Sequence, residues 1–515
     1  MRREGKRDPA IGIVAAALLV ACAALLVACA ALLVEEAYGE EELVTELANG
    51  FTATHSADAP GRFEPFLYAP NGVFALGFLR VGVSSLDLAV LHLPSSFPLW
   101  RATPARVADW SRPATLSFDG RMVLATGPGE GTVVLWSTLN VIGDTVALLN
   151  SSELVIRHYD LRSPSWRSFD SPSDTLVLDQ NFTHSSPPLI SHNRRFALRL
   201  GKTYMALHME FYGGHTRPMY WQHTAMMAQP ENATEPPVYG RLDGRGFYGL
   251  YLQGSNGDDT VDKLAFDTFV QNLTGAFRRM TLEDDGNLRA YYWTDGSKAW
   301  TSDFQAISGQ CQLPTSCGAY SMCVPGEAGP RCQCLVNGTT GGTTSPPCAA
   351  EETADLCGAG QLFDVVRRSR VSLAYKERVP FETYKTAAEC EESCAANCTC
   401  WGAVYNGDSG YCYLIGFPVE TVVYEADDRK VGYFKVRKAQ PQRSAARPRA
   451  MSPGVTAATV LLSLVLAVAG AYVGYWLWER RRRRRAGGVG MEQELTARPY
   501  RDLKSMDSSK NSFKA

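Results

Sequence analysis

The chain has 515 residues, of which 45% are hydrophobic and 20% are charged, so it can form several folded domains with apolar cores. Its 51 lysines and arginines nearly balance its 53 aspartates and glutamates, which leaves a net charge of -2. A chain without a basic excess has no field that attracts phosphate groups, so a nucleic-acid partner is not expected.

The first hydrophobic segment covers residues 11–34 and follows a basic N-terminus. This arrangement is typical of a secretory signal peptide, which we expect over residues 1–39. The apolar run is longer than a usual signal core, so the cleavage position stays open and an uncleaved anchor is the alternative.

Residues 43–179 contain short apolar runs that are broken by turn pairs such as Asn71-Gly72 and Asp119-Gly120. Such a pattern predicts antiparallel β structure. Three tryptophans within these runs are expected to pack in a β-prism or barrel core. They are Trp100, Trp136 and Trp166. Residues 180–305 continue as β-rich sequence, in which Asp285-Gly286-Asn287 predicts a hairpin turn.

Several motifs of this part resemble the bulb-type (G-type) lectin domain that leads the ectodomain of plant S-locus glycoproteins and their receptor kinases. The motifs are NGVFALGF at 71–78, VVLW at 133–136, ELVI at 153–156 and SWRSFDSPSDTLVLDQ at 165–180. The resemblance implies a mainly β fold with a bulb-lectin-type β-prism over residues 43–179. The stretch RRMTLEDDGNLRAYYWTDGSKAW at 278–300 is similar to the second region of S-locus glycoproteins, expected over residues 180–305.

Mannose-binding members of that family carry the motif Q-x-D-x-N-x-V-x-Y, whose polar groups bond to sugar hydroxyls. In this chain the stretch 149–157 holds, at the five motif positions, Leu149, Ser151, Glu153, Val155 and Arg157. The stretch 117–125 holds Ser117, Asp119, Arg121, Val123 and Ala125. A third, partial echo consists of Glu283, Asp285, Asn287 and Tyr291, with Arg289 in place of the valine. Degenerate mannose sites are therefore expected, and Asp119 and Asp285 are interpreted as turn residues.

Twelve of the 14 cysteines fall between Cys311 and Cys412, and the other two lie in the predicted signal. An even number in one short stretch favours disulfides, and the close pairs have C-x-C spacing instead of the C-x2-C spacing of zinc sites. Residues 307–349 resemble an EGF-like module. That resemblance implies three disulfides, Cys311–Cys323, Cys317–Cys332 and Cys334–Cys348.

With TAAECEESCAAN at 386–397 and GYC at 410–412, residues 350–438 resemble a plant PAN/apple domain, an α+β module that acts in recognition and brings no catalytic residue. Thr386 and Glu389 form a capping box, so a helix is predicted to begin there with Cys390 and Cys394 on one face. The family pairing implies three disulfides, Cys390–Cys412, Cys394–Cys400 and Cys357–Cys398.

Six N-x-S/T sequons lie between the two hydrophobic segments and predict N-glycosylation in the secretory pathway. They begin at Asn150, Asn181, Asn232, Asn272, Asn337 and Asn397.

The second hydrophobic segment, residues 455–478, is long enough to cross a bilayer as a helix of about 36 Å. A stalk over residues 439–454 precedes it, and the cluster Arg480 to Arg485 follows it. Arginines on both flanks leave the charge rule undecided, but the denser cluster and the signal favour a single-pass type I protein of the plasma membrane. The arginine cluster is expected to contact anionic lipid.

The predicted cytoplasmic tail, residues 479–515, is too short to enclose a kinase active site, whereas family members usually continue into a kinase. Tyr500 and Leu503 fit a Y-x-x-Φ sorting motif, and a solvated tail is the alternative. The sequence thus predicts a kinase-less receptor-like protein without enzyme activity or cofactor, which binds an extracellular protein or glycan and a partner receptor kinase. A functional membrane-anchored mannose lectin is the alternative, and an extracellular carbohydrate-active enzyme is less expected because no catalytic motif appears.

Overall fold

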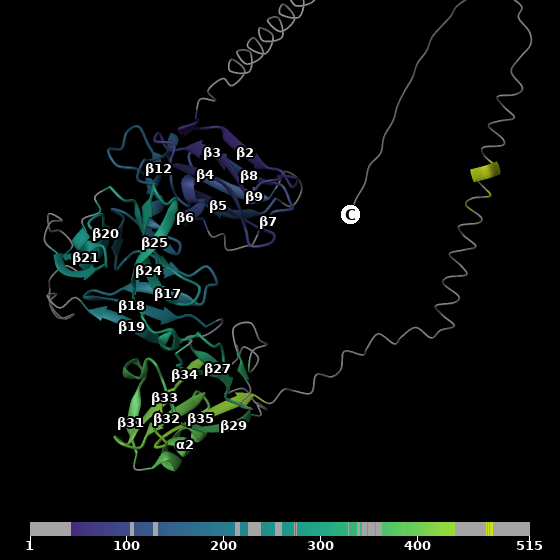
Figure 1. Cartoon of the computed structure of the whole chain (residues 1–515). Coiled ribbons are helices and arrows are strands. Elements are labelled where there is room, and N and C mark those ends of the chain that lie inside the picture. The colour runs from purple at the N-terminus through teal and green to yellow at the C-terminus, as the bar shows by residue number, and fades with distance from the viewer. Residues whose placement is uncertain are drawn as a thin grey trace, which may run out of the picture. The chain divides into compact units, whose positions relative to one another are not determined.

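Antiparallel strands make up most of the regular structure in this computed structural model, as the sequence predicts (Figure 1). The structure describes parts of residues 43–437, together with Gly470, Tyr472, Gly474, Tyr475 and Trp476. The residues left out between 43 and 437 are 103–107, 127–131, 212–216, 225–237, 253–259, 272, 274, 328, 337–339, 342–347, 349–355, 357–362 and 385. The chain divides into two compact units, Met1–Lys438 and Ala439–Ala515, and the strands discussed below belong to the first.

The first region, residues 43–170, consists of three sheets around one apolar core. The sheets have the strand orders β3-β4-β5-β6 with β7 beside β5, β10-β9-β8-β2, and β1-β11-β12-β13, as a β-prism requires. The elements are β1 (Glu46–Ala48), β2 (Phe51–His55), β3 (Phe63–Tyr68), β4 (Phe74–Val81), β5 (Ser85–His92), η1 (Leu93–Ser95), β6 (Phe97–Arg101), β7 (Ala108–Asp109), β8 (Ala114–Phe118), β9 (Met122–Thr126), β10 (Val134–Ser137), β11 (Thr145–Leu148), β12 (Leu154–Arg157), β13 (Trp166–Arg167) and η2 (Ser168–Asp170).

The three predicted core tryptophans meet at the centre of the first region. The rings of Trp100, Trp136 and Trp166 pack edge to face in all three pairs, with centroids 5.8 to 6.1 Å apart. Trp100 is 6% exposed, and its indole Nε1–H donates a hydrogen bond to the carbonyl oxygen of Ser171 at 2.8 Å. The tryptophans therefore serve packing, as expected.

The second region, residues 171–306, repeats the scheme with three four-stranded sheets. Their orders are β14-β23-β24-β25, β15-β20-β21-β22 and β16-β17-β18-β19. Strand β14 lies within the segment expected to belong to the lectin-like domain, yet it pairs with β23. The elements are β14 (Thr175–Val177), β15 (Asn181–Thr183), β16 (Leu189–Ile190), β17 (Phe196–Leu200), β18 (Tyr204–Met209), β19 (Met219–Thr224), β20 (Val238–Asp243), β21 (Phe247–Leu252), β22 (Thr260–Ala265), η3 (Phe269–Gln271), β23 (Arg278–Leu282), β24 (Leu288–Thr294) and β25 (Ala299–Gln305).

The C-terminal region, residues 307–437, contains two sheets and the helix α2. Strands of the expected EGF-like module and of the expected PAN domain share the sheet β28-β27-β26-β34-β30, in which β26 and β34 run parallel. The second sheet has the order β29-β35-β32-β33-β31. The elements are η4 (Gln310–Gln312), β26 (Ser321–Val324), β27 (Arg331–Cys334), β28 (Thr340–Gly341), β29 (Phe363–Ser369), β30 (Val371–Ser372), η5 (Lys376–Arg378), β31 (Phe381–Thr383), α2 (Ala387–Ala396), β32 (Gly402–Asn406), β33 (Tyr411–Ile415), β34 (Thr421–Tyr424) and β35 (Lys430–Arg437).

Disulfides tie this C-terminal region together. The structure contains the pairs Cys311–Cys323, Cys317–Cys332, Cys334–Cys348, Cys390–Cys412 and Cys394–Cys400. All five are pairs that the family resemblance implies. Cys398 is also disulfide-bonded, whereas its expected partner, Cys357, lies outside the described residues.

Helix α2 begins at the predicted capping box. The backbone N–H of Glu389 donates to Thr386 Oγ1 at 3.2 Å, and the N–H of Thr386 donates to Glu389 Oε2 at 3.1 Å. At the other end the buried ammonium of Lys435 donates to the carbonyl oxygens of Cys394 and Asn397 at 2.8 and 2.9 Å. A cation at this end also suits the helix dipole, and it could not be predicted from the sequence because Lys435 lies on a distant strand.

The expected membrane segment, residues 455–478, falls almost wholly outside the described residues. Within the described part of the chain, no helix is both long enough and apolar enough to span a bilayer.

Candidate functional site

The first mannose-like stretch, residues 149–157, forms the turn between β11 and β12 and then β12 itself. Val155 is completely buried. Glu153 is 5% exposed, and its carboxylate accepts hydrogen bonds from Nε and Nη2 of Arg167 at 2.6 and 3.0 Å. Because this two-pronged ion pair engages both carboxylate oxygens, Glu153 serves the fold instead of a sugar hydroxyl.

The second stretch, residues 117–125, forms the hairpin between β8 and β9, as its Asp-Gly pair predicts. Gly120 has a φ of +74°, and its backbone N–H donates to Asn49 Oδ1 at 2.7 Å. The second amide position of the motif is taken by Arg121, which can only donate hydrogen bonds. This hairpin therefore lacks the amide that the sugar motif places there.

The third stretch is the hairpin between β23 and β24, where Gly286 has a φ of +86°. Its polar side chains bind one another or the backbone. Tyr291 donates to Glu283 at 2.7 Å, Asp285 pairs with Arg289 at 2.6 Å, and the buried Asn287 donates to the carbonyl oxygen of Ile307 at 2.7 Å. The expected turn is confirmed, and these groups are used in holding it.

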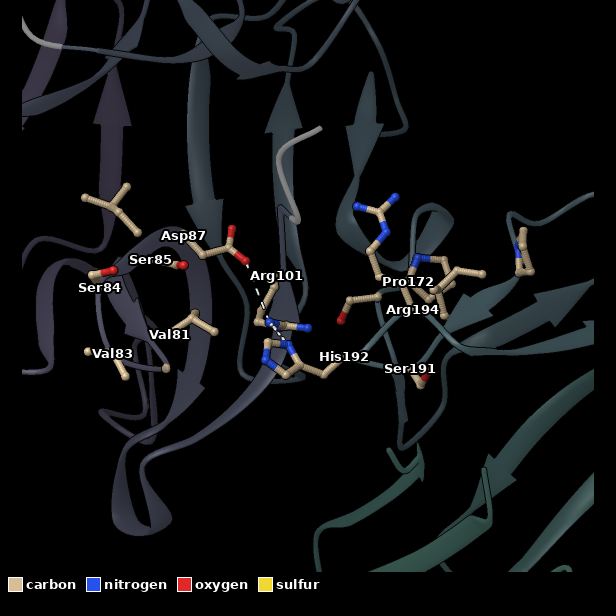
Figure 2. Close-up of a pocket in the computed structure, with 15 residues that line it drawn as sticks. Val81, Val83, Ser84, Ser85, Asp87, Arg101, Pro172, Ser191, His192 and Arg194 are labelled. Carbon is tan, nitrogen blue, oxygen red and sulfur yellow. Dashed lines mark hydrogen bonds and ion pairs between the residues drawn. The ribbon is translucent and has the colours of Figure 1, made fainter. Parts of the chain in front are cut away.

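A cavity of about 460 Å³ lies where the first and second regions meet (Figure 2). A cavity of this size suits a small molecule. One wall is the β4–β5 hairpin, and the other is formed by residues before and after β16. Its apolar lining consists of Val81, Val83, Leu86, Pro172, Pro188 and Ile190.

Arg101, at the end of β6, forms the charged floor of the cavity and is 7% exposed. Its Nη1 lies 3.9 Å from Asp87 Oδ2, and its Nη2 donates to Asp174 Oδ2 at 3.3 Å. Nη1 also donates to Nδ1 of His192 at 2.7 Å, and Figure 2 shows Arg101 between Asp87 and His192. A buried guanidinium in such a network is stabilised by its partners and joins the two walls.

An aromatic junction holds the two regions against each other at the other end of β5. His92, at the end of β5, packs on the rings of Phe277, Trp293 and Trp300 at centroid distances of 5.7, 4.9 and 5.4 Å. Burial lowers the pKa of His92 to about 4, because the uncharged imidazole is favoured in this setting. The junction thus packs the end of β5 against aromatic rings of the second region.

Arg279, on β23, reinforces the same junction. Its guanidinium carbon lies 3.6 Å from the centroid of the Phe97 ring and 3.9 Å from that of Tyr291. Burial lowers the pKa of Arg279 to about 10. The cation therefore bridges aromatic rings of both regions.

Three of the six sequon asparagines are described, and all three are exposed: Asn150, Asn181 and Asn397. Asn150 Oδ1 accepts a hydrogen bond from the N–H of Asn71 at 2.9 Å. The others, Asn232, Asn272 and Asn337, lie outside the described residues, as do Tyr500, Leu503 and the cluster Arg480 to Arg485. N-glycosylation and sorting remain predictions. Among the described residues, no three His, Cys, Asp or Glu side chains gather as metal ligands would.

The sequence did not single out the polar residues of the cavity. The sequence around Asp87 and Arg101 could have indicated a buried polar site, because each is a charged residue next to a run of apolar strand residues. The sequence around His192 and Arg194 offers no such indication, since they occupy an ordinary turn that only the tertiary fold brings to the cavity. No local pattern could have placed the two walls together.

Comparison with known proteins assigns two parts of the chain to domain families. Residues 250–339 match the S-locus glycoprotein domain, and residues 357–436 match the PAN domain. The first of these matches spans the end of the second region and the start of the C-terminal region.

Relatives that match larger parts of the chain point to the same domain families. A PAN domain-containing protein of Arabidopsis thaliana is 37% identical over 90% of this chain and 91% of its own length. A G-type lectin S-receptor-like serine/threonine-protein kinase of Arabidopsis thaliana is 24% identical over 66% of this chain, which spans 44% of that kinase. EP1-like glycoprotein 4 of Arabidopsis thaliana is 25% identical over 65% of this chain and 77% of its own length. The chain therefore belongs to the family of PAN domain-containing proteins that combine an S-locus glycoprotein domain with a PAN domain.

Proposed function

We propose that this protein is a kinase-less, receptor-like recognition protein of the cell surface, which binds an extracellular ligand or partner receptor and signals through that partner. The observation that carries the proposal is the similarity to a receptor-like kinase over about two thirds of the chain, together with the matches to the S-locus glycoprotein and PAN domains. The relative that is 37% identical is matched over 91% of its length and is named for its PAN domain, which supports a family form without a kinase.

Two structural features support an extracellular position for the first compact unit. Five disulfides join described residues of its C-terminal region, and disulfides form and persist in oxidising compartments such as the secretory pathway and the cell exterior. Three predicted glycosylation asparagines have exposed side chains, as modification requires. A type I membrane protein with a short cytoplasmic tail accommodates both features.

A membrane-anchored mannose lectin is the second candidate function, because the first region has the three-sheet arrangement of a bulb lectin. The mannose-like positions disfavour it. Glu153 is paired with Arg167, and Glu283 and Asp285 are bound within their own hairpin. Clear mannose-specific binding on a glycan array would nevertheless favour the lectin over a receptor-like protein with degenerate sites.

Proximity labelling from both ends of the full chain tests the proposal. A labelling enzyme fused after residue 515 and, separately, one placed after the signal should mark the same transmembrane receptor kinase on opposite sides of the membrane. A single-pass protein of unrelated ectodomain, expressed at the same level, is the control. If neither fusion labels a transmembrane neighbour above that control, the protein does not signal through a partner receptor.

A further inference from the structure

The cavity between the first and second regions has a charged side chain with ion-pair partners at its floor and one without such a partner among the described residues at its rim. Arg101, at the floor, lies 3.3 Å from Asp174 and 3.9 Å from Asp87. Arg194, at the rim, is exposed and has no hydrogen bond or ion pair from its side chain to any described residue. A guanidinium without an intramolecular partner can bind an anion without breaking an existing contact.

His192 adds a second hydrogen-bond donor to the lining of the cavity. A guanidinium can only donate, so Nδ1 of His192 must accept the 2.7 Å hydrogen bond from Arg101. The neutral imidazole then carries its proton on Nε2, which is left as a donor. The same turn holds His192 and Arg194, because the N–H of Arg194 donates to the carbonyl oxygen of Ser191 at 2.8 Å.

The opposite wall offers apolar surface and hydroxyl groups. Val81 and Val83 of the β4–β5 hairpin face the cavity, and Val83 is 85% exposed at the hairpin tip (Figure 2). The hydroxyls of Ser84 and Ser85 make no hydrogen bond to any described residue. None of the described lining residues is Phe, Tyr or Trp, whereas a site for a neutral sugar usually stacks the sugar ring on one of these.

We propose that this cavity binds a small amphipathic organic acid. Its carboxylate is held by Arg194, and its apolar body packs against Val81, Val83 and Ile190. A planar guanidinium matches a carboxylate in shape and charge, and the valine and isoleucine side chains favour the removal of an apolar group from water. The inference rests on the proposed recognition function and names the ligand class of its site.

Titration calorimetry on the purified full chain tests the ligand class with defined probes. We expect 3-phenylpropanoate and hexanoate to bind at one site. The amide 3-phenylpropanamide, which has the same shape without the charge, should bind about tenfold more weakly or less, since a charged hydrogen bond contributes on the order of a tenfold affinity. Acetate, which lacks the apolar body, should not saturate the site. Equal affinities of the acid and its amide, or no binding of either acid, would overturn the proposal.

Two variants locate the binding site. Arg194 has a φ of +60°, and asparagine adopts that conformation readily, so Arg194→Asn keeps the turn and should lower acid affinity about tenfold. Arg162→Asn changes another exposed arginine, outside the cavity, and is the matched control. Val83→Asp should weaken binding of the acid and leave the amide unaffected, because like charges repel across the cavity.

The proposal fails if Arg194→Asn binds the acid as tightly as Arg162→Asn does, with unchanged melting temperatures for both variants. That result is independent of the proximity labelling. A protein that labels a partner receptor but binds no acid keeps its proposed function and loses this ligand, and the reverse outcome keeps the ligand and removes the receptor partnership.

Discussion

The first region and the C-terminal region are stabilised by different interactions. No cysteine lies between Cys29 and Cys311, so the first region is held by side-chain packing around the ring cluster of Trp100, Trp136 and Trp166. In the C-terminal region the sulfur atoms are themselves part of the interior, since Cys390, Cys394, Cys400 and Cys412 are buried with Tyr405 and Tyr433.

Individual strands of the two regions also differ in length and burial. Strands β4 and β5 have eight residues each and are buried over most of their length, so they bury enough surface to stabilise a sheet. Strands β30 and β31 have two and three residues, and β31 is exposed throughout. Short strands bury little apolar surface, and cross-links that restrict the unfolded chain compensate for this. The two regions should therefore be destabilised by different substitutions.

Loss of aromatic packing should have the largest effect, and only on the first region. Trp100→Ala removes a 6% exposed ring and is expected to lower the free energy of unfolding by about 4 kcal/mol. Chemical denaturation, monitored by hydrogen exchange of β4–β6, measures this loss of stability. Tyr159→Ala, at an 82% exposed ring, is the control and should change stability by less than about 0.5 kcal/mol. A cost below about 1 kcal/mol for Trp100→Ala would contradict a core role for this ring.

Removal of one disulfide should have the next largest effect and should spare the first region. The double variant Cys390→Ala/Cys412→Ala opens a cross-link with a sequence separation of 22 and should cost about 3 kcal/mol. Hydrogen exchange should then lose protection in α2 and in β32–β35. Unchanged exchange in β8 and β9 is the internal control, and equal loss in both regions would show that they unfold as one unit.

Acidification should affect the junction between the first and second regions. The pKa of His92 is lowered from 6.5 to about 4, so the folded state binds fewer protons than the unfolded state between these values. The contribution of the uncharged His92 to the free energy of unfolding is complete above a pH of about 6.5. It is lost as the pH falls, by about 2 kcal/mol between about pH 7 and about pH 5. Thermal unfolding across this range measures it.

The matching variant for this effect is His92→Phe, which keeps an aromatic ring in the junction and removes the titrating group. Its unfolding free energy should depend less steeply on pH than that of the natural chain over the same range. Parallel pH curves for the two proteins would show that His92 does not contribute to the acid sensitivity.

The helix cap should have the smallest effect, confined to the C-terminal region. Thr386→Ala removes the hydrogen bond that the N–H of Glu389 donates to Thr386 Oγ1, and should cost about 1 kcal/mol. The exposed Glu392, in the middle of α2, offers a control in Glu392→Ala, which should be nearly neutral. Denaturant titration of both variants distinguishes a cap from a general effect of helix substitution.

Local features of the fold could be predicted from the sequence, because they depend on neighbouring residues. The Asp119-Gly120 turn is confirmed by the β8–β9 hairpin and by the positive φ of Gly120, and the Thr386–Glu389 capping box is confirmed by its two hydrogen bonds. The positions of the cross-links followed from resemblance to known modules, since six cysteines allow fifteen pairings and spacing alone does not choose among them.

Long-range features could not be predicted. Strand β14 pairs with β23 although about a hundred residues separate them, and a short apolar strand does not encode which sheet it joins. The parallel pairing of β26 with β34 unites two expected modules in one sheet for the same reason. The cavity depends on such contacts, because Arg101 and His192 meet only after both regions have folded.

Strand β35 has a mechanical consequence. It is the last strand before residue 438, and it pairs along its length with β29 and over five residues with β32. Any tension that reaches the domain through the chain after Arg437 acts first on these two rows of hydrogen bonds. A strand that is hydrogen-bonded on both sides resists such a pull better than one at a sheet edge. The sheet should therefore stay folded under a force applied at Arg437 that would detach an edge strand.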